Sequence, residues 1–226
     1  MQPDNMTVKS LLSHSTPPLR PEDTVEYALG LLMEIRVRHL PVVSSEMELL
    51  GVLSEGQLLD ADNPDVLVGT LIGVEPVSIS EHAHVFEATK VLMDHNLTTL
   101  AVVSESGRYL GLVRRHDLFD RFARMLATQE SGAIVSLEIA ERDAALSRII
   151  HLFEQNDVRV LSLSTEAHND AEGTIGVTIK VNVREVSRIK HLLEHNGYKV
   201  VAAFGEDEDP EDLLDRVQEF MRYLEV

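Results

Sequence analysis

The sequence predicts an α/β protein of the α+β kind: a duplicated β-α-β-β-α unit, then a βαββαβ domain and a C-terminal helix. Three observations support this prediction. A repeat aligns residues 8–60 with residues 68–120 without a gap. Over residues 133–204, alternating apolar runs and helix-like patterns follow one another in the order β, α, β, β, α, β. After Pro210, apolar residues recur on one face of a helix.

The composition narrows the class of protein. A hydrophobic fraction of 44% in 226 residues is enough for buried cores. No apolar run approaches the roughly 20 residues of a membrane helix, so we expect no membrane partner. The absence of cysteine excludes disulfides and thiolate chemistry and is consistent with a cytoplasmic location. The net charge of −18 repels phosphate backbones, which argues against a nucleic-acid partner.

Each copy of the repeat has the same order of elements. A single copy has a small core, whereas two copies can pack sheet against sheet. In the first copy we expect a leading strand near Leu19, a helix from Val25, strands at Leu40–Val43 and Leu49–Leu53, and a closing helix near Gly56; in the second copy these elements begin near Ile79, Val85, Leu100, Tyr109 and His116.

The duplicated unit resembles the CBS domain family, and the pair resembles a Bateman module. The resemblance rests on Arg38–Val43 and Gly51–Ser54 in the first copy, and on Leu100–Val103 and Gly111–Asp117 in the second. It implies a non-catalytic regulatory protein, in which an adenine nucleotide lies in a cleft between the copies. The implied ligand is AMP, ADP, ATP or a molecule of the S-adenosylmethionine type, and no cofactor is required.

The family motif after the second strand is Gly-h-x-Thr/Ser-x-x-Asp, where h is apolar. The hydroxyl contacts phosphate or ribose, and the carboxylate accepts hydrogen bonds from the ribose. The first copy keeps the hydroxyl at Ser54 but has Gln57 in place of the acid; the second has Arg114 and keeps Asp117. The resemblance implies that Asp117 contacts the ribose and that Arg114 contacts a phosphate.

Basic residues before the first core strand contact phosphates in this family. Arg38 and His39 hold that place, so with Ser54 they would define the other cleft. Structural roles remain as alternatives: Asp117 as an acid at a helix N-terminus, Ser54 as a helix cap, and His39 as a packed or surface histidine. The half-motifs also allow a second function, an interaction scaffold with degenerate, unoccupied clefts.

The histidines do not indicate a metal centre. His82 and His84 form His-x-His with His95 nearby, but two such ligands do not close a zinc site and no cysteine is present. No local motif of a hydrolase, metalloprotease or P-loop enzyme occurs. We therefore predict no catalytic residue and no metal site.

The second half has the βαββαβ order of ferredoxin-like folds. The expected elements are a strand at Ala133–Ile139, a helix capped by Asp143, strands at Val158–Leu163 and Ile175–Val181, a helix closing at Asn196-Gly197, and a strand at Tyr198–Phe204.

This half resembles an ACT domain, a regulatory module that often binds amino acids. The family's ligand turn, Asp-x-Pro-Gly, is replaced by Glu141-Arg142-Asp143-Ala144, and the Ala144 methyl group occupies the place of the glycine. We therefore expect this domain to serve dimerisation. Two CBS copies followed by an ACT-like domain are similar to the acetoin-utilisation B proteins, which again implies regulation.

Four domains are predicted: CBS repeats at 1–62 and 63–130, an ACT-like domain at 131–205, and an acidic linker with an amphipathic helix at 206–226. For the acidic residues of this last segment, a cation-binding loop is the alternative to a solvated linker. For its helix, packing within a homodimer is expected, and docking on another protein partner is the alternative.

Overall fold

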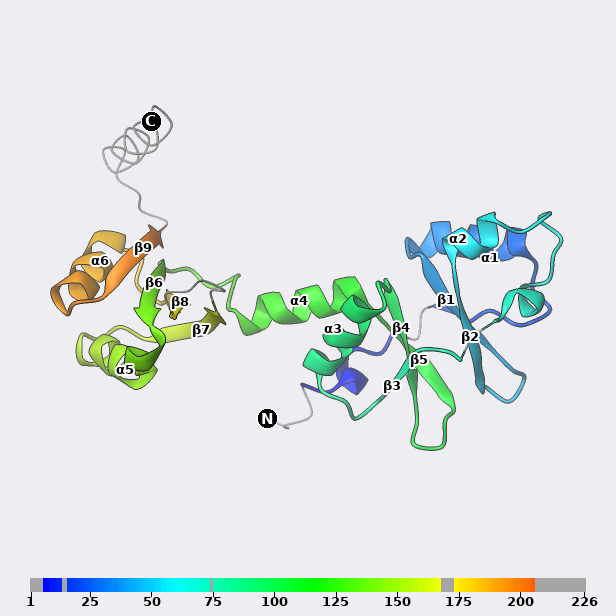
Figure 1. The fold of residues 1–226 in the computed structure, drawn as a ribbon, viewed down its shortest axis with the longest axis horizontal. Coiled ribbons are helices and arrows are strands. Elements are labelled where there is room, and N and C mark those ends of the chain that lie inside the picture. Colours follow the sequence, from blue (N-terminus) through cyan, green and yellow to red (C-terminus); the bar gives the residue numbers. More distant parts are fainter. Residues whose placement is uncertain (1–5, 14–15, 74, 168–172, 206–226) are drawn as a thin grey trace, which may run out of the picture. The chain divides into compact units, whose positions relative to one another are not determined.

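The computed structural model describes residues 6–13, 16–73, 75–167 and 173–205 (Figure 1). It divides the chain into two compact units, Met1–Arg121 and Phe122–Val226. The predicted acidic linker and C-terminal helix at 206–226 lie outside the described residues. None of the described helices is long and apolar enough to cross a membrane.

The first unit contains the two predicted repeats. The leading strand of the first copy is reduced to a single bridge between Leu19 and Val42, whereas that of the second copy is a true strand. The elements are α1 (Val25–Ile35), β1 (His39–Val43), β2 (Leu49–Ser54) and α2 (Glu55–Leu59) in the first copy, and β3 (Ser78–Ser80), α3 (Val85–Asp94), β4 (Thr99–Val103), β5 (Tyr109–Arg114) and α4 (Arg115–Met125) in the second.

Side-chain caps determine where the first helix of each copy begins. Thr24 Oγ1 accepts a hydrogen bond from the Tyr27 N–H at the start of α1, at 3.2 Å. His84 Nδ1 accepts one from the Phe86 N–H at the start of α3, also at 3.2 Å. Each cap satisfies a backbone donor that the helix itself leaves free.

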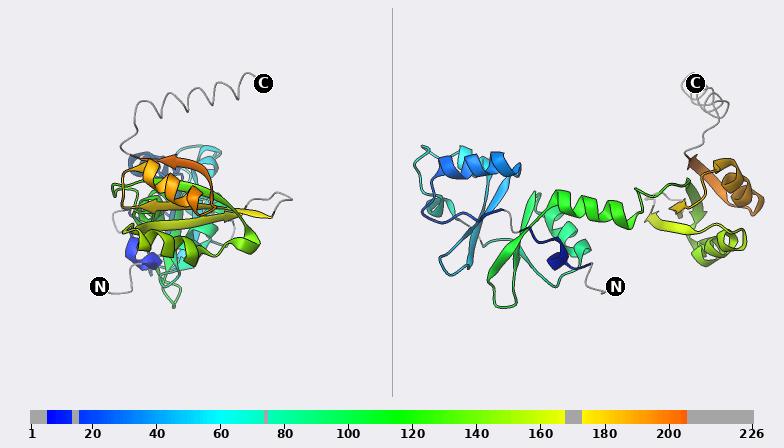
Figure 2. Two further views of the ribbon diagram at one scale, coloured as in Figure 1. Left: turned by 90° about the vertical axis from the view of Figure 1, so that its left-hand side faces the viewer. Right: turned by 180° about the vertical axis from the view of Figure 1, so that it is seen from behind.

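The two copies meet through their β-hairpins, which lie side by side (Figures 1 and 2). Val43, Ala101 and Tyr109 form a buried cluster that draws on both hairpins. The Tyr109 N–H also donates to the Met47 carbonyl oxygen at 2.8 Å. The repeats therefore share part of their core, as sheet-against-sheet packing requires.

The short segments that precede the two repeats are exchanged between them. The Val8 N–H donates to the carbonyl oxygen of Ala83 in the second copy, and the Val68 N–H donates to that of Asp23 in the first, both at 2.9 Å. Val68 belongs to the buried core of the first copy, and both valines are fully buried. Each repeat is thus completed by the segment that leads into the other one.

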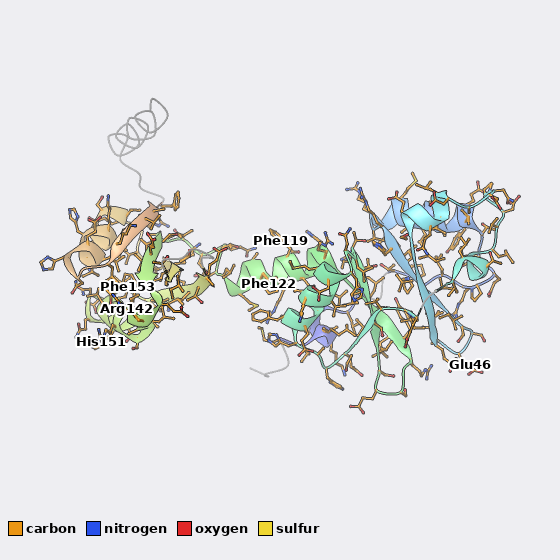
Figure 3. All side chains as sticks on the ribbon, in the orientation of Figure 1. Glu46, Phe119, Phe122, Arg142, His151 and Phe153 are labelled. Atoms are coloured by element: carbon orange, nitrogen blue, oxygen red, sulfur yellow. The ribbon has the colours of Figure 1, made fainter. Side chains whose placement is uncertain are left out.

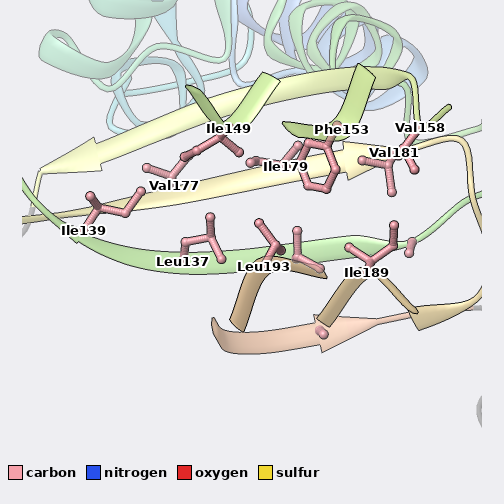
Figure 4. Packing of buried hydrophobic residues seen from close by; sticks show 13 residues of the cluster. Leu137, Ile139, Ile149, Phe153, Val158, Val177, Ile179, Val181, Ile189 and Leu193 are labelled. Carbon is pink, nitrogen blue, oxygen red and sulfur yellow. The ribbon is translucent and has the colours of Figure 1, made fainter. Parts of the chain in front are cut away.

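The second unit is a four-stranded antiparallel sheet in the order β7-β8-β6-β9. Its core lies between this sheet and helices α5 and α6 (Figure 4). The predicted βαββαβ order is confirmed, with elements β6 (Ile134–Ala140), α5 (Leu146–Gln155), β7 (Val160–Ala167), β8 (Thr174–Val181), α6 (Val186–His195) and β9 (Lys199–Phe204).

The ends of the two helices in this unit test the predicted caps. Gly197 follows α6 with φ of 82°, a left-handed conformation that glycine adopts without strain, as predicted. The predicted cap at Asp143 is wrong. Glu141–Asp143 form a 3-10 turn, and α5 begins only at Leu146, with Ala145 at the cap position. The chain therefore completes this turn before the helix starts.

Candidate functional site

A cleft of about 370 Å³ lies between the two copies in the first unit. It is formed where β1 and β4 begin and where the helices that follow β2 and β5 start. Residues of both copies therefore face one cavity. They are Arg38, His39, Ser54, Glu55 and Gly56 from the first copy and Asn96, Thr98 and Arg115 from the second.

Backbone contacts place the same two elements together in each copy. The Glu55 N–H donates to the Arg38 carbonyl oxygen at 2.8 Å, and the Arg115 N–H donates to that of Thr98 at 2.9 Å. The two contacts are related by the 60-residue repeat. Each hydrogen bond holds the first turn of a helix beside the residue that precedes a core strand. The side chains of both elements therefore lie at the cleft.

Hydrogen bonds join the two copies beside the cleft. The Arg38 N–H donates to Thr98 Oγ1 at 2.9 Å, and the Thr98 N–H donates to His39 Nδ1 at 3.2 Å. Thr99 Oγ1 donates to the His39 carbonyl oxygen at 2.7 Å. The start of β1 is thus bonded to the start of β4.

The cleft is electropositive, although the chain carries a net charge of −18. Arg38 and Arg115 supply two guanidinium groups, and Glu55 supplies one carboxylate, 3.7 Å from Arg38 Nε. Arg115 is held by a 2.6 Å bond to the Leu97 carbonyl oxygen. Burial lowers the pKa of His39, and the charges of Arg115 and Arg38 lower it further. The arginines therefore carry the positive charge at neutral pH.

Ser54 lines the cleft and also caps α2. Its Oγ accepts the Gln57 N–H at 3.2 Å, and Gln57 Oε1 accepts the Ser54 N–H at 2.9 Å, which makes a capping box. Gln57 stands in the place of the family's acid, and its side-chain oxygen is engaged in this capping box.

Arg114 and Asp117 do not line this cleft but pair with each other. Arg114 Nε donates to Asp117 Oδ2 at 3.0 Å, and the terminal nitrogen NH2 donates to Oδ1 at 2.8 Å. Asp117 Oδ2 also accepts the Arg114 N–H at 3.1 Å. A ribose contact at Asp117 and a phosphate contact at Arg114 stay predictions, and in this structure both side chains are engaged with each other.

The cleft also contains four residues that were not predicted from the sequence: Arg115, Asn96, Glu55 and Gly56. A signal for Arg115 was present, because the repeat aligns it with Glu55 and the charge is reversed at that pair of positions. Asn96 carried no such signal. It reaches the cleft from the turn after α3, where its φ of 49° is left-handed.

The three histidines considered for a metal have other surroundings. His84 caps α3, His95 is the residue that ends it, and His82 is an exposed side chain 4.0 Å from Glu81 and Glu105. Within the described ranges, no group of three His, Cys, Asp or Glu side chains could hold a metal ion.

A second cavity, of about 590 Å³, lies in the second unit beside α6. It is lined mainly by exposed side chains, among them Arg188, His191, Glu194 and His195. The cleft between the repeats is the better candidate for a binding site, because it combines partly buried polar groups with fixed hydrogen bonds from two elements.

Known proteins show the same duplicated unit. The sequence matches the CBS domain family over residues 8–63 and 68–124, half of the chain. A CBS domain-containing protein of Dictyostelium discoideum is 30% identical over 53% of this chain and 92% of its own length. An inosine-5'-monophosphate dehydrogenase of Korarchaeum cryptofilum is 28% identical over 87% of this chain, which spans 38% of the length of that relative.

Among solved structures, a CBS domain pair/ACT domain protein of Thermotoga maritima matches 54% of this chain and 99% of its own, with 24% identity and a TM-score of 0.49. The matches to the ACT and acetoin-utilisation B families stay predictions. The tandem repeat, its helices and strands and the family match agree with one another. The chain therefore belongs to the CBS domain family.

Proposed function

We propose that this protein is a non-catalytic regulator that senses an adenine nucleotide or a related adenosyl ligand in the cleft between its CBS repeats. The observation that carries this proposal is the pair of guanidinium groups, Arg38 and Arg115, in an otherwise strongly acidic chain. Arginine binds phosphate through strong charge-assisted hydrogen bonds. In CBS pairs the nucleotide lies between the copies, where these two residues stand.

Regulation would follow from the position of the ligand. A ligand that touches both repeats binds unequally to two arrangements of them and so favours one. The hydrogen bonds of Arg38 and His39 to Thr98 link the repeats at this point. The βαββαβ unit, as an ACT-like domain, would transmit the change within a homodimer or to a protein partner, in a reducing compartment such as the cytoplasm.

The second candidate is a CBS/ACT interaction scaffold with unoccupied clefts. Two contacts favour it: Asp117 is engaged by Arg114, and Gln57 is used in the capping box of α2. Neither copy presents a free side chain at the position of the family's ribose-binding acid.

Thermal-shift and calorimetric titrations with AMP, ADP, ATP and S-adenosylmethionine separate the two functions. A ligand that binds only the folded protein raises its melting temperature. We expect stabilisation by at least one phosphate-bearing nucleotide, and about tenfold weaker binding in Arg38→Gln, because a charge-assisted bond is lost. Lys90→Gln is the matched control, since it removes one exposed positive charge outside the cleft. No stabilisation by any of these ligands would favour the scaffold.

A further inference from the structure

We propose that Thr98 of the second repeat is a positioning residue that holds His39 of the first as a neutral imidazole with its proton on Nε2. His39 then acts on the ligand as a hydrogen-bond donor and not as a cation. This inference rests on the proposed nucleotide site and names a residue that sets how the site recognises its ligand.

The hydrogen bonds at Nδ1 fix the tautomer. The Thr98 N–H donates to His39 Nδ1 at 3.2 Å, and a ring nitrogen that accepts a hydrogen bond carries no proton. Thr98 Oγ1 lies 3.1 Å from the same nitrogen and accepts the Arg38 N–H at 2.9 Å. Its own hydrogen is therefore available to Nδ1. Two donors at Nδ1 leave Nε2 as the nitrogen that carries the ring proton.

The charges around the cleft favour the same neutral form. The groups that face it with His39 are Arg38 just before β1, Glu55 on α2 and Arg115 on α4. Two guanidinium groups against one carboxylate disfavour a third positive charge. Burial and these arginines lower the pKa of His39, in agreement with the hydrogen-bond geometry.

The arrangement occurs only once in the pair of repeats. Positions 38 and 39 of the first copy are Arg and His, whereas the equivalent positions of the second copy are Thr98 and Thr99. The threonines donate to His39, one to its ring and one to its carbonyl oxygen. The first repeat therefore supplies the basic pair, and the second repeat supplies the threonines that hold His39.

The consequence concerns how binding depends on pH. A protonated histidine would add a charge to the phosphate contact, and that contribution would disappear as the pH rises through its pKa. A neutral Nε2–H donor offers the same hydrogen bond throughout the neutral range. The attraction for phosphate then comes from Arg38 and Arg115, which stay charged, and His39 adds direction.

Long-range ¹H–¹⁵N NMR of the full chain with ¹⁵N-labelled histidine tests the assignment without a ligand. We expect His39 at pH 7 to show an unprotonated Nδ1 and a protonated Nε2. In Thr98→Val the hydroxyl donor is lost and the shape is kept, so the pKa of His39 should rise by roughly half to one pH unit. Thr98→Ser, which keeps the hydroxyl, should restore the wild-type titration.

Three outcomes would overturn the inference: a proton on Nδ1 in the wild type, a charged His39 at pH 7, or the same pKa in Thr98→Val as in the wild type. The wild-type spectrum decides the question even if the valine variant does not fold. Addition of ATP should shift the Nε2–H resonance of His39, and binding of ATP without such a shift would refute the donor role. A failure of all four ligands, AMP, ADP, ATP and S-adenosylmethionine, to bind would refute the proposed function, whereas the tautomer is measured independently of any ligand.

Discussion

Asp117 and Gln57 stand 60 residues apart at equivalent positions of the two repeats, and each lies in the first turn of a helix. Gln57 reaches back to the Ser54 N–H, and Asp117 reaches back to the Arg114 N–H. The difference lies in the charge. Asp117 also binds the guanidinium of Arg114 through both oxygens, so one carboxylate serves the helix terminus and an ion pair.

Replacing Asp117 with asparagine should lower the free energy of unfolding of the first unit by about 1 kcal/mol. The ion pair is partly exposed, with 34% of the Arg114 side chain and 18% of that of Asp117 accessible, so its contribution is screened by water. Asp120→Asn removes the same charge from a more exposed site on the same helix and should cost less. Urea unfolding of both variants measures the difference, and equal stability in the two would contradict this role of Asp117.

At the scale of secondary-structure elements, the exchanged leading segments tie the two repeats to each other. The contacts of Val8 with the second copy and of Val68 with the first obey the same 60-residue offset. The alignment matches Val8 with Val68 but does not tell which sheet either segment joins, because the apolar pattern only says that both are buried. The exchange is therefore visible in the structure alone.

Val68→Ala should destabilise the first unit by about 2 kcal/mol, because a fully buried side chain is truncated in the core of the other repeat. Leu67→Ala is the matched control: Leu67 is the adjacent residue and is 46% exposed, so its loss should cost much less. Chemical denaturation followed by a probe in the first unit compares the two. A smaller loss for Val68→Ala than for Leu67→Ala would refute the structural role of the exchange.

Strands and helices could be predicted where the apolar period was clear, as in β6, whose residues alternate in burial from Ile134 to Ala140. The sequence failed to predict the start of a helix where the same residues were compatible with either a helix cap or a turn. Asp143 precedes an apolar helical pattern, yet the chain makes a 3-10 turn first. In the site, Arg38, His39 and Ser54 could be found from the family motif, whereas Asn96 depends on a left-handed turn that no motif encodes.

At the scale of the whole molecule, we predict a homodimer. Large apolar side chains are exposed at repeat-related places: Met33 and Met93 at 76% and 72%, Leu59 and Phe119 at 65% and 69%. Of these, Phe119 on α4 is labelled in Figure 3. Apolar surface that repeats with this symmetry suits a two-fold interface. Light scattering should give twice the mass of one 25.2 kDa chain, and Phe119→Glu should weaken the dimer. A single-chain mass for the wild type at micromolar concentration would refute the prediction.

We expect the first unit to fold and to bind the ligand without the second, because each unit has its own buried core. The clusters of the first unit draw on residues 19–72 and 43–109, and that of the second on residues 133–203. All residues that line the cleft lie within Met1–Arg121. A chain that ends near Ser131 should therefore fold and bind the nucleotide with the affinity of the full protein, and a chain that begins there should not bind it. Calorimetry on both fragments and on the full chain measures this directly. Binding that survives only in the second fragment would move the site out of the CBS repeats.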